Sequence, residues 1–193
     1  NVGIYSYYFK NIFDKVDAFE PLSEITHRLR SIHNGSLNVH NVALSNKIGE
    51  LQFYIPIING KTFPQLASLE KRDGDCEVRT VKVETVDCHD FDDVDLIKID
   101  VEGHERFVIE GALKVIKKNM PILIIEIEQR HIEFEIHEVF RSILSLNYSG
   151  FFLQKGILTS LKEFSYELNQ KPFLENVEDN RTISNYFHNV HII

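Results

Sequence analysis

The chain has 193 residues, of which 43% are hydrophobic, and this length and composition predict one globular domain over residues 1–193. Its formal net charge of −8, with no run of basic residues, excludes nucleic acid as the main partner, because phosphate binding needs concentrated positive charge. No apolar run approaches the roughly 20 residues of a membrane span. The two cysteines fit neither a disulfide framework nor a metal knuckle, so we expect reduced thiols in a cytoplasmic protein and assign no metal ligand.

Apolar periodicity and turn residues predict alternating helices and strands along the first two-thirds of the chain. In chain order these are a helix from residue 4, a strand at 15–20, a helix from Ser23, a strand at 37–45, its hairpin partner at 50–55 and a strand at 77–85. A strand at 95–102, a helix at 105–118 and a strand at 122–128 follow. Residues 57–75 are the least regular stretch, so we expect a long loop with a lid or substrate-facing role.

The last third of the chain shows weaker patterns. They predict a helix near 136–144, a hairpin of strands at 148–155 and 157–161, a polar loop at 162–180 and a final strand at 184–192. Alternating helices and strands favour a parallel sheet with helices on both faces. We therefore predict an α/β, Rossmann-like fold: a mostly parallel central sheet flanked by helices, with a β-hairpin insertion and antiparallel closing strands.

Acidic residues gather at the end of the strand at 95–102 and just after it. Asp100 and Glu102 stand at its carboxyl end, directly before Gly103 and the next helix. Open α/β sheets bind ligands at that edge. Three carboxylates within six residues (Asp100, Glu102 and Glu105) are costly to bury unless a ligand, a metal or a hydrogen-bond network uses them.

This run, Asp-Leu-Ile-Lys-Ile-Asp-Val-Glu-Gly-His-Glu over residues 95–105, resembles the signature of FkbM-type methyltransferases, which depend on S-adenosylmethionine. Three further motifs are similar to that family: residues 1–6 (Asn-Val-Gly-Ile-Tyr-Ser), 18–21 (Ala-Phe-Glu-Pro) and 41–45 (Asn-Val-Ala-Leu-Ser). The resemblance extends to about residue 128 and implies a class I methyltransferase fold. In the family a strand ending in Asp-x-Gly-x precedes the first motif, so we expect such a strand upstream of Asn1.

The resemblance also implies roles for the motif residues. Backbone groups of the glycine turn would face S-adenosylmethionine, the residues there being Asn1, Gly3 and Tyr5. Glu20, followed by Pro21, would accept hydrogen bonds from the ribose hydroxyls, and this role is favoured over the alternative of a solvent-exposed strand-end glutamate. Ala43 and Leu44 would form an apolar wall for the adenine. Asp100 would lie near the methionine end, and we expect Glu20 and Asp100 to converge on one cleft.

Methyl transfer to a hydroxyl requires a base that removes the proton from the oxygen. His104 and His131 are candidate bases because histidine titrates near neutral pH, while Asp100 and Glu102 compete for the role. Glu126 and Glu128 fall on one face of their strand and could, with Asp100, hold Mg²⁺. Hydrogen-bonded acids lining a polar pocket are the preferred interpretation.

Three functions remain open. The leading hypothesis is methylation of a sugar or small-molecule hydroxyl with S-adenosylmethionine as the cofactor. An NAD-dependent oxidoreductase also fits a strand-end acid after a glycine turn, but it gives residues 95–105 no role. A non-catalytic methyltransferase-like domain or fragment is the third. The sequence predicts a small-molecule or glycan acceptor and no nucleic-acid partner, and it does not predict the oligomeric state.

Overall fold

The computed structural model describes residues 3–32, 37–71, 73–174 and 190–192. Contacts between its elements divide the chain into two compact units. The first unit comprises Asn1–His89 and Phe107–Ala112, and the second comprises Asp90–Arg106 and Leu113–Ile193. The expectation of a single domain over residues 1–193 stays a prediction.

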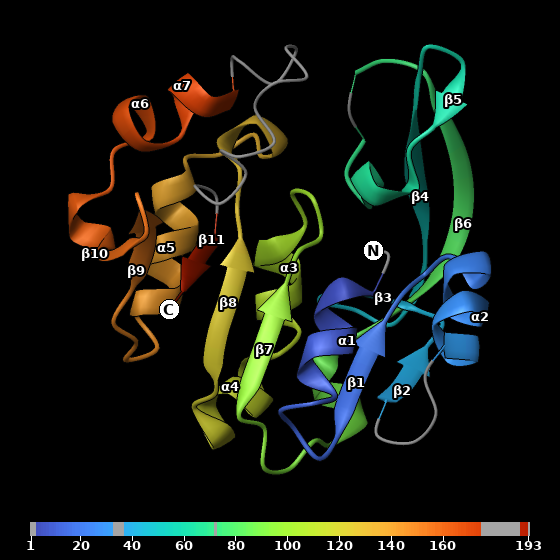
Figure 1. Cartoon of the computed structure of the whole chain (residues 1–193), viewed down its shortest axis with the longest axis horizontal. Coiled ribbons are helices and arrows are strands. Elements are labelled where there is room, and N and C mark those ends of the chain that lie inside the picture. The colour runs from blue at the N-terminus through green and yellow to red at the C-terminus, as the bar shows by residue number, and fades with distance from the viewer. Residues whose placement is uncertain (1–2, 33–36, 72, 175–189, 193) are drawn as a thin grey trace. The chain divides into compact units, whose positions relative to one another are not determined.

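The first unit contains two small sheets (Figure 1). Its elements are α1 (Ile4–Phe9), β1 (Val16–Phe19), α2 (Ser23–Ile32), β2 (Leu37–His40), β3 (Ala43–Leu44), β4 (Gly49–Ile58), β5 (Lys61–Thr62), η1 (Pro64–Leu66), β6 (Cys76–Glu84) and η2 (Val86–His89). Strands β1 and β2 form a parallel pair, and the second sheet has the order β3-β6-β4-β5.

The second unit is built on a five-stranded sheet with the order β10-β9-β11-β8-β7. Its elements are β7 (Leu96–Ile99), α4 (Leu113–Asn119), β8 (Ile122–Glu126), η3 (Gln129–His131), α5 (Ile136–Leu144), β9 (Phe151–Gln154), β10 (Ile157–Ser160), η4 (Leu161–Glu163), α6 (Tyr166–Asn169), α7 (Lys171–Leu174) and β11 (Val190–Ile192). Helix α3 (Glu105–Glu110) begins in this unit and ends in the first. Strands β7 and β8 are parallel, whereas the other pairs in this sheet are antiparallel.

Each unit buries its own apolar cluster. In the first unit one cluster consists of Leu22, Ala43, Phe53, Ile55, Ala67, Val81 and Val83. In the second unit, side chains of β8 and α5 that are less than 5% exposed include Leu123, Ile125, Ile136, Val139, Phe140 and Ile143. Phe164 extends this core, because its ring packs edge-on against Phe140 and Phe152. The buried alternation along β8 agrees with the predicted core strand.

The structure confirms the mixed α/β content but not a mostly parallel central sheet. Among the described residues the strands fall into three separate sheets, and both parallel and antiparallel pairs occur. The hairpin predicted at 148–161 is confirmed, with β9 and β10 paired around Lys155 and Gly156. Of the strand predicted at 184–192, only Val190–Ile192 lies within the described residues.

The predicted pairing of residues 50–55 with the preceding strand is wrong. Strand β4 pairs antiparallel with β6, from Gly49 opposite Val83 to Pro56 opposite Cys76. The predicted strand at 37–45 divides into β2, which pairs with β1, and the two-residue β3, which pairs with β6. Strand β6 offers the longer ladder for the backbone of β4. Ser68 also exchanges backbone hydrogen bonds with Tyr54, so the stretch predicted as a loop folds back onto β4.

The helix predicted at 105–118 is interrupted at Gly111. A Cβ atom at this position would lie 2.0 Å from the backbone oxygen of Ser45, so only glycine permits the approach. The Gly111 carbonyl accepts a hydrogen bond from the amide of Asp87 at 2.9 Å. The chain therefore forms α3 and α4 as two short helices on either side of this contact.

Helix α1 confirms the predicted helix at the start of the chain, but its apolar side chains are exposed. Ile4 and Tyr8 are each 60% exposed.

None of the described helices combines the length and the apolar character that crossing a bilayer requires.

Candidate functional site

The carboxyl ends of β7 and β8 bring charged side chains together in the second unit. The two strands run parallel with Ile99 opposite Ile125, so Asp100 and Glu126 occupy adjacent positions at the same edge. Asp100 accepts a hydrogen bond from the ammonium group of Lys98 at 2.8 Å. The Lys98 side chain is 10% exposed and that of Asp100 19%, so this ion pair is largely shielded from water.

Glu126 has an altered acidity. Burial raises its pKa from 4.5 to about 7, and the negative charge of nearby Asp100 adds to the shift. The positive charge of Lys98 opposes it. A carboxylic acid that titrates near neutral pH can take up or release a proton under ordinary conditions, which is a common property of active sites.

The turn after β7 has an unusual backbone. Glu102 has φ 55° and Gly103 has φ 102°, so two successive residues adopt left-handed conformations. A Cβ atom at Gly103 would lie 2.4 Å from the backbone oxygen of His131, so this position requires glycine both for its φ and for the close approach. The turn thereby packs directly against η3.

His131 lies between two carboxylates. Its Nδ1 is 3.0 Å from Oε2 of Glu102, and its Nε2 is 3.6 Å from Oε2 of Glu128. The imidazole is 9% exposed and Glu128 is 5% exposed. Glu128 also pairs with the guanidinium of Arg130. The two acids and the burial of the ring thus fix the orientation of His131, which is one of the predicted bases.

The other residues of the turn are more deeply buried. Glu105 is 2% exposed, and one of its carboxylate oxygens accepts a hydrogen bond from the amide of Gly103 at 2.9 Å. Burial raises the pKa of Glu105 to about 7. His104 is 5% exposed. The buried Glu105 carboxylate therefore stabilises the turn through its hydrogen bond with the Gly103 amide.

Two glutamines that the sequence analysis did not single out hold the segment containing His131. Gln170 is fully buried; it donates to the carbonyl of Ile127 at 2.7 Å and accepts from the amide of Gln129 at 2.8 Å. The Gln129 side chain in turn accepts from the amide of Ile136. No local pattern marks Gln170, because its partners lie far away in the sequence. Lys98 was recognisable from its i, i+2 spacing to Asp100, because side chains two residues apart in extended backbone point to the same side.

The predicted glycine turn lies at the start of the first unit. Gly3 has φ 87° and precedes α1 in a left-handed conformation. Tyr5 is 42% exposed, and its ring lies 6.0 Å from that of Phe9. Asn1 lies outside the described residues.

Glu20 is buried at the end of β1. It is 6% exposed, and its carboxylate accepts a hydrogen bond from the amide of Leu22 at 2.9 Å. The side chain of Asn41 donates to the carbonyls of Glu20 and Pro21. The alternative of an exposed strand-end glutamate is therefore wrong, because the chain folds around this carboxylate.

Ala43 and Leu44, the predicted adenine wall, form β3 and pair with β6 opposite Val83 and Glu84. Within the first unit, Asn41 thus links the turn of Glu20 and Pro21 to the segment just before β3. Within the second unit, Glu102 and His131 are brought together. The expectation that Glu20 and Asp100 share one cleft concerns residues of different units and stays a prediction.

A hollow of about 300 Å³ in the second unit lies elsewhere and contains none of the predicted site residues. It is lined by Glu135, His137, Phe140, Arg141, Leu144, Leu161 and Lys162. The side chains at the ends of β7 and β8 therefore define the candidate site, apart from this hollow.

Comparison with known proteins indicates the family and the fold of this chain. Residues 5–151 match the sequence profile of the methyltransferase FkbM domain. A crystal structure of methyltransferase FkbM from Methylobacillus flagellatus KT resembles this chain with a TM-score of 0.53 and 18% sequence identity, over 75% of this chain and 35% of the solved one. Among proteins with curated descriptions, none matches the chain. The structural likeness shows a shared fold, and the profile match spans most of the sequence. The chain belongs to the methyltransferase FkbM domain family.

Proposed function

We propose that this protein is an S-adenosylmethionine-dependent methyltransferase that methylates a hydroxyl group of a sugar or another small molecule. The observation that carries the proposal is the family match over residues 5–151, which includes both the end of β1 with Glu20 and the acidic turn after β7. A Rossmann-like arrangement of the strands, as in class I methyltransferases, is part of the same proposal.

The chemistry of the first unit fits such a cofactor. Ribose hydroxyls need a hydrogen-bond acceptor, and the Glu20 carboxylate is buried at a strand end and already held by a backbone amide. Gly3 adopts the left-handed conformation that a tight turn before a helix requires. We assign cofactor binding to Asn1, Gly3, Tyr5, Glu20, Pro21, Ala43 and Leu44, with Asp100 at the methionine end.

When bound, S-adenosylmethionine supplies an electrophilic methyl group on a sulfonium. The protein must then place the acceptor oxygen in line with this methyl group and remove the hydroxyl proton. Of the two candidate histidines, His131 suits the base better, because its Nδ1 lies 3.0 Å from Glu102. An Nδ1–H donated to this carboxylate leaves the lone pair on Nε2 to accept the proton.

The neighbouring acids would stabilise the charged ring. When His131 takes the proton, the imidazolium lies between Glu102 and Glu128, and both carboxylates favour its positive charge. Asp100, fixed by Lys98, would orient the acceptor hydroxyl or the methionine end of the cofactor. His104, at 5% exposure, is less suited to meet a substrate.

Ligand-dependent thermal stability tests the proposal. A ligand that binds only the folded state raises the melting temperature with its concentration. We expect S-adenosylmethionine and S-adenosylhomocysteine to raise the melting temperature and NAD to have no effect. Stabilisation by NAD alone would favour the oxidoreductase hypothesis, and no response to any of the three would favour a non-catalytic domain.

A further inference from the structure

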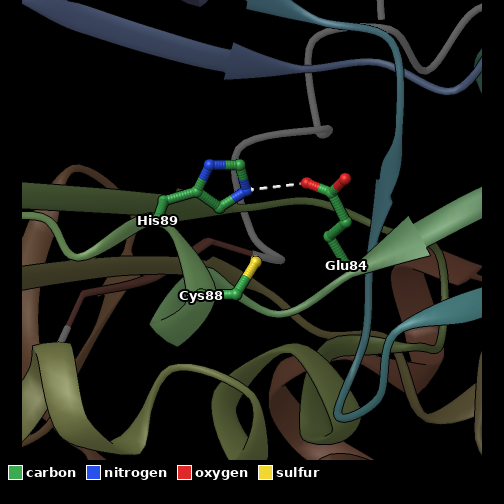
Figure 2. Close-up of side chains that lie close together, drawn as sticks. All are labelled: Glu84, Cys88 and His89. Atoms are coloured by element: carbon green, nitrogen blue, oxygen red, sulfur yellow. Dashed lines mark ion pairs between the residues drawn. The ribbon is translucent and has the colours of Figure 1, made fainter.

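Three different potential metal ligands gather between the last residue of β6 and the last two residues of η2 (Figure 2). A carboxylate oxygen of Glu84, the sulfur of Cys88 and a ring nitrogen of His89 all lie within 4.8 Å of one another. The His89 Nε2 atom is 3.0 Å from Oε2 of Glu84. Figure 2 shows the Cys88 sulfur pointing toward the space beside this pair. None of the three residues has a role in the proposed methyl transfer.

We propose that Glu84, Cys88 and His89 form a binding site for a divalent cation of the zinc class. Thiolate and imidazole ligands suit Zn²⁺, whereas Mg²⁺ and Ca²⁺ take oxygen ligands almost exclusively. A thiolate, a carboxylate and a neutral imidazole together carry two negative charges, which balance the charge of the ion. The mixture of a soft sulfur, a nitrogen and an oxygen distinguishes this cluster from an ordinary group of surface acids.

The distances between the donors are compatible with tetrahedral coordination. A tetrahedral ion with bonds of about 2.0–2.3 Å holds its donor atoms roughly 3.3–3.8 Å apart. The donors here lie within 4.8 Å, and one pair is already at 3.0 Å. Binding an ion therefore requires the donor atoms to move by about 1 Å, a shift of the size that side-chain rotations produce.

The backbone around the cluster is anchored at two points. The Glu84 carbonyl accepts a hydrogen bond from the amide of Ser45 at 2.8 Å, and the amide of Asp87 donates to the carbonyl of Gly111. The turn that carries Cys88 and His89 is therefore tied to its neighbours on both sides. Rigid backbone positions reduce the ordering cost of binding an ion.

The ring of His89 is also held in place. It contacts the rings of Phe19 and His40 edge-on, at centroid distances of 5.0 and 5.1 Å. His40 is itself held by a hydrogen bond between its Nε2 and the Asp17 carboxylate at 2.8 Å. This packing limits the rotation of the imidazole and keeps it near Glu84.

The site would keep one coordination position open. Among the described residues, no fourth histidine, cysteine or acid joins the group, so water would complete the tetrahedron. Cys88 is exposed, which gives the ion a path of entry. Its thiol now donates to the Thr85 carbonyl at 3.1 Å. Binding would replace this hydrogen bond with a metal–sulfur bond and release the thiol proton to solvent, so affinity should rise with pH.

Titration with Co²⁺ tests the site, because cobalt bound to a thiolate gives a sulfur-to-metal charge-transfer absorption. We expect this absorption in the unmodified protein and in Cys76→Ser, the matched control at the other free cysteine, and its loss in Cys88→Ser. Zn²⁺ should displace the cobalt, whereas Mg²⁺ should not. In calorimetry, His89→Gln and Glu84→Gln should each weaken Zn²⁺ binding by about tenfold or more.

A second measurement on the unmodified protein avoids any effect of substitution on folding. Zn²⁺ should slow alkylation of Cys88 by iodoacetamide, measured by mass spectrometry, without slowing alkylation of Cys76. The proposal is overturned if folded protein shows no charge-transfer absorption with Co²⁺, if the absorption depends on Cys76, or if Zn²⁺ leaves the alkylation rate of Cys88 unchanged.

Discussion

Nδ1 of His131 lies 3.0 Å from Oε2 of Glu102, and this contact joins the turn after β7 to the segment after β8. Glu102 reaches the imidazole from a left-handed backbone conformation, with φ 55°. Such a conformation in a non-glycine residue costs about 1–3 kcal/mol and persists only where its surroundings enforce it. The strained turn and the oriented histidine are therefore two parts of one local arrangement.

Replacement of His131 tests its role as the base. We expect His131→Ala to lower the turnover of S-adenosylmethionine by roughly 10²-fold to 10⁴-fold, the usual range for loss of a general base. Formation of S-adenosylhomocysteine with a panel of sugars measures this turnover. The control is His27→Ala, which removes an exposed histidine of α2. Equal turnover in both variants would exclude His131 as the base.

Gly103 should be intolerant of any side chain. Gly103→Ala places a Cβ atom 2.4 Å from the His131 carbonyl oxygen and retains an unfavourable φ of 102°. We expect a loss of about 2 kcal/mol or more in the free energy of unfolding, measured with urea. Gly156→Ala is the matched control, because φ there is 82° but nothing lies within 4 Å. If both variants lose the same amount, the contact with His131 carries no cost.

Stability should decrease as the pH rises toward neutrality. The pKa of Glu126 is about 7 in the folded protein and near 4.5 when unfolded, so the folded state binds more protons between these values. The free energy of unfolding should therefore fall from about pH 4.5 to about pH 7 and level off above. Glu105 contributes in the same direction.

Glu126→Gln should reduce this slope, because glutamine does not titrate. Urea denaturation at a series of pH values measures the slope, and Glu133→Gln, at an exposed position, should leave it unchanged. An identical slope in the protein and in Glu126→Gln would show that Glu126 titrates normally.

Gln170 should stabilise the segment that carries His131. Gln170→Leu keeps a similar volume but leaves the Ile127 carbonyl and the Gln129 amide without their partner. Stranding buried polar groups costs about 1–3 kcal/mol each, so we expect a loss of this order or more in thermal and urea unfolding. The same change at exposed Gln154 should cost little. A stable Gln170→Leu variant would mean that water replaces the side chain.

Local patterns in the sequence predicted the elements well but not all of their partners. Alternating residues identified β4 and β6 as strands, yet they could not indicate that these two pair with each other across the intervening segment. The break at Gly111 was also hidden, because the residues around it favour helix and only the contact with Ser45 requires the glycine.

In the candidate site, too, local groups of residues could be predicted from the sequence, whereas contacts between distant residues could not. The run from Asp100 to Glu105 was recognisable because its members are neighbours in the sequence. The link between Glu102 and His131 was not, because it depends on the parallel register of β7 and β8. The contact between Asn41 and the Glu20 carbonyl was likewise hidden, because the two residues lie 21 positions apart in the sequence.

Calorimetric titration of S-adenosylmethionine into the protein and into Glu20→Ala tests the central claim most directly. We expect measurable binding to the protein and a loss of about 1–3 kcal/mol in the variant, because the ribose hydroxyls would lose their acceptor. Glu50→Ala, at an exposed position of β4, should bind like the unmodified protein. Because Glu20 also accepts from the Leu22 amide, circular dichroism must show that the variant is folded. Unchanged affinity in folded Glu20→Ala would remove Glu20 from the site, and no binding to the unmodified protein would contradict the proposed function.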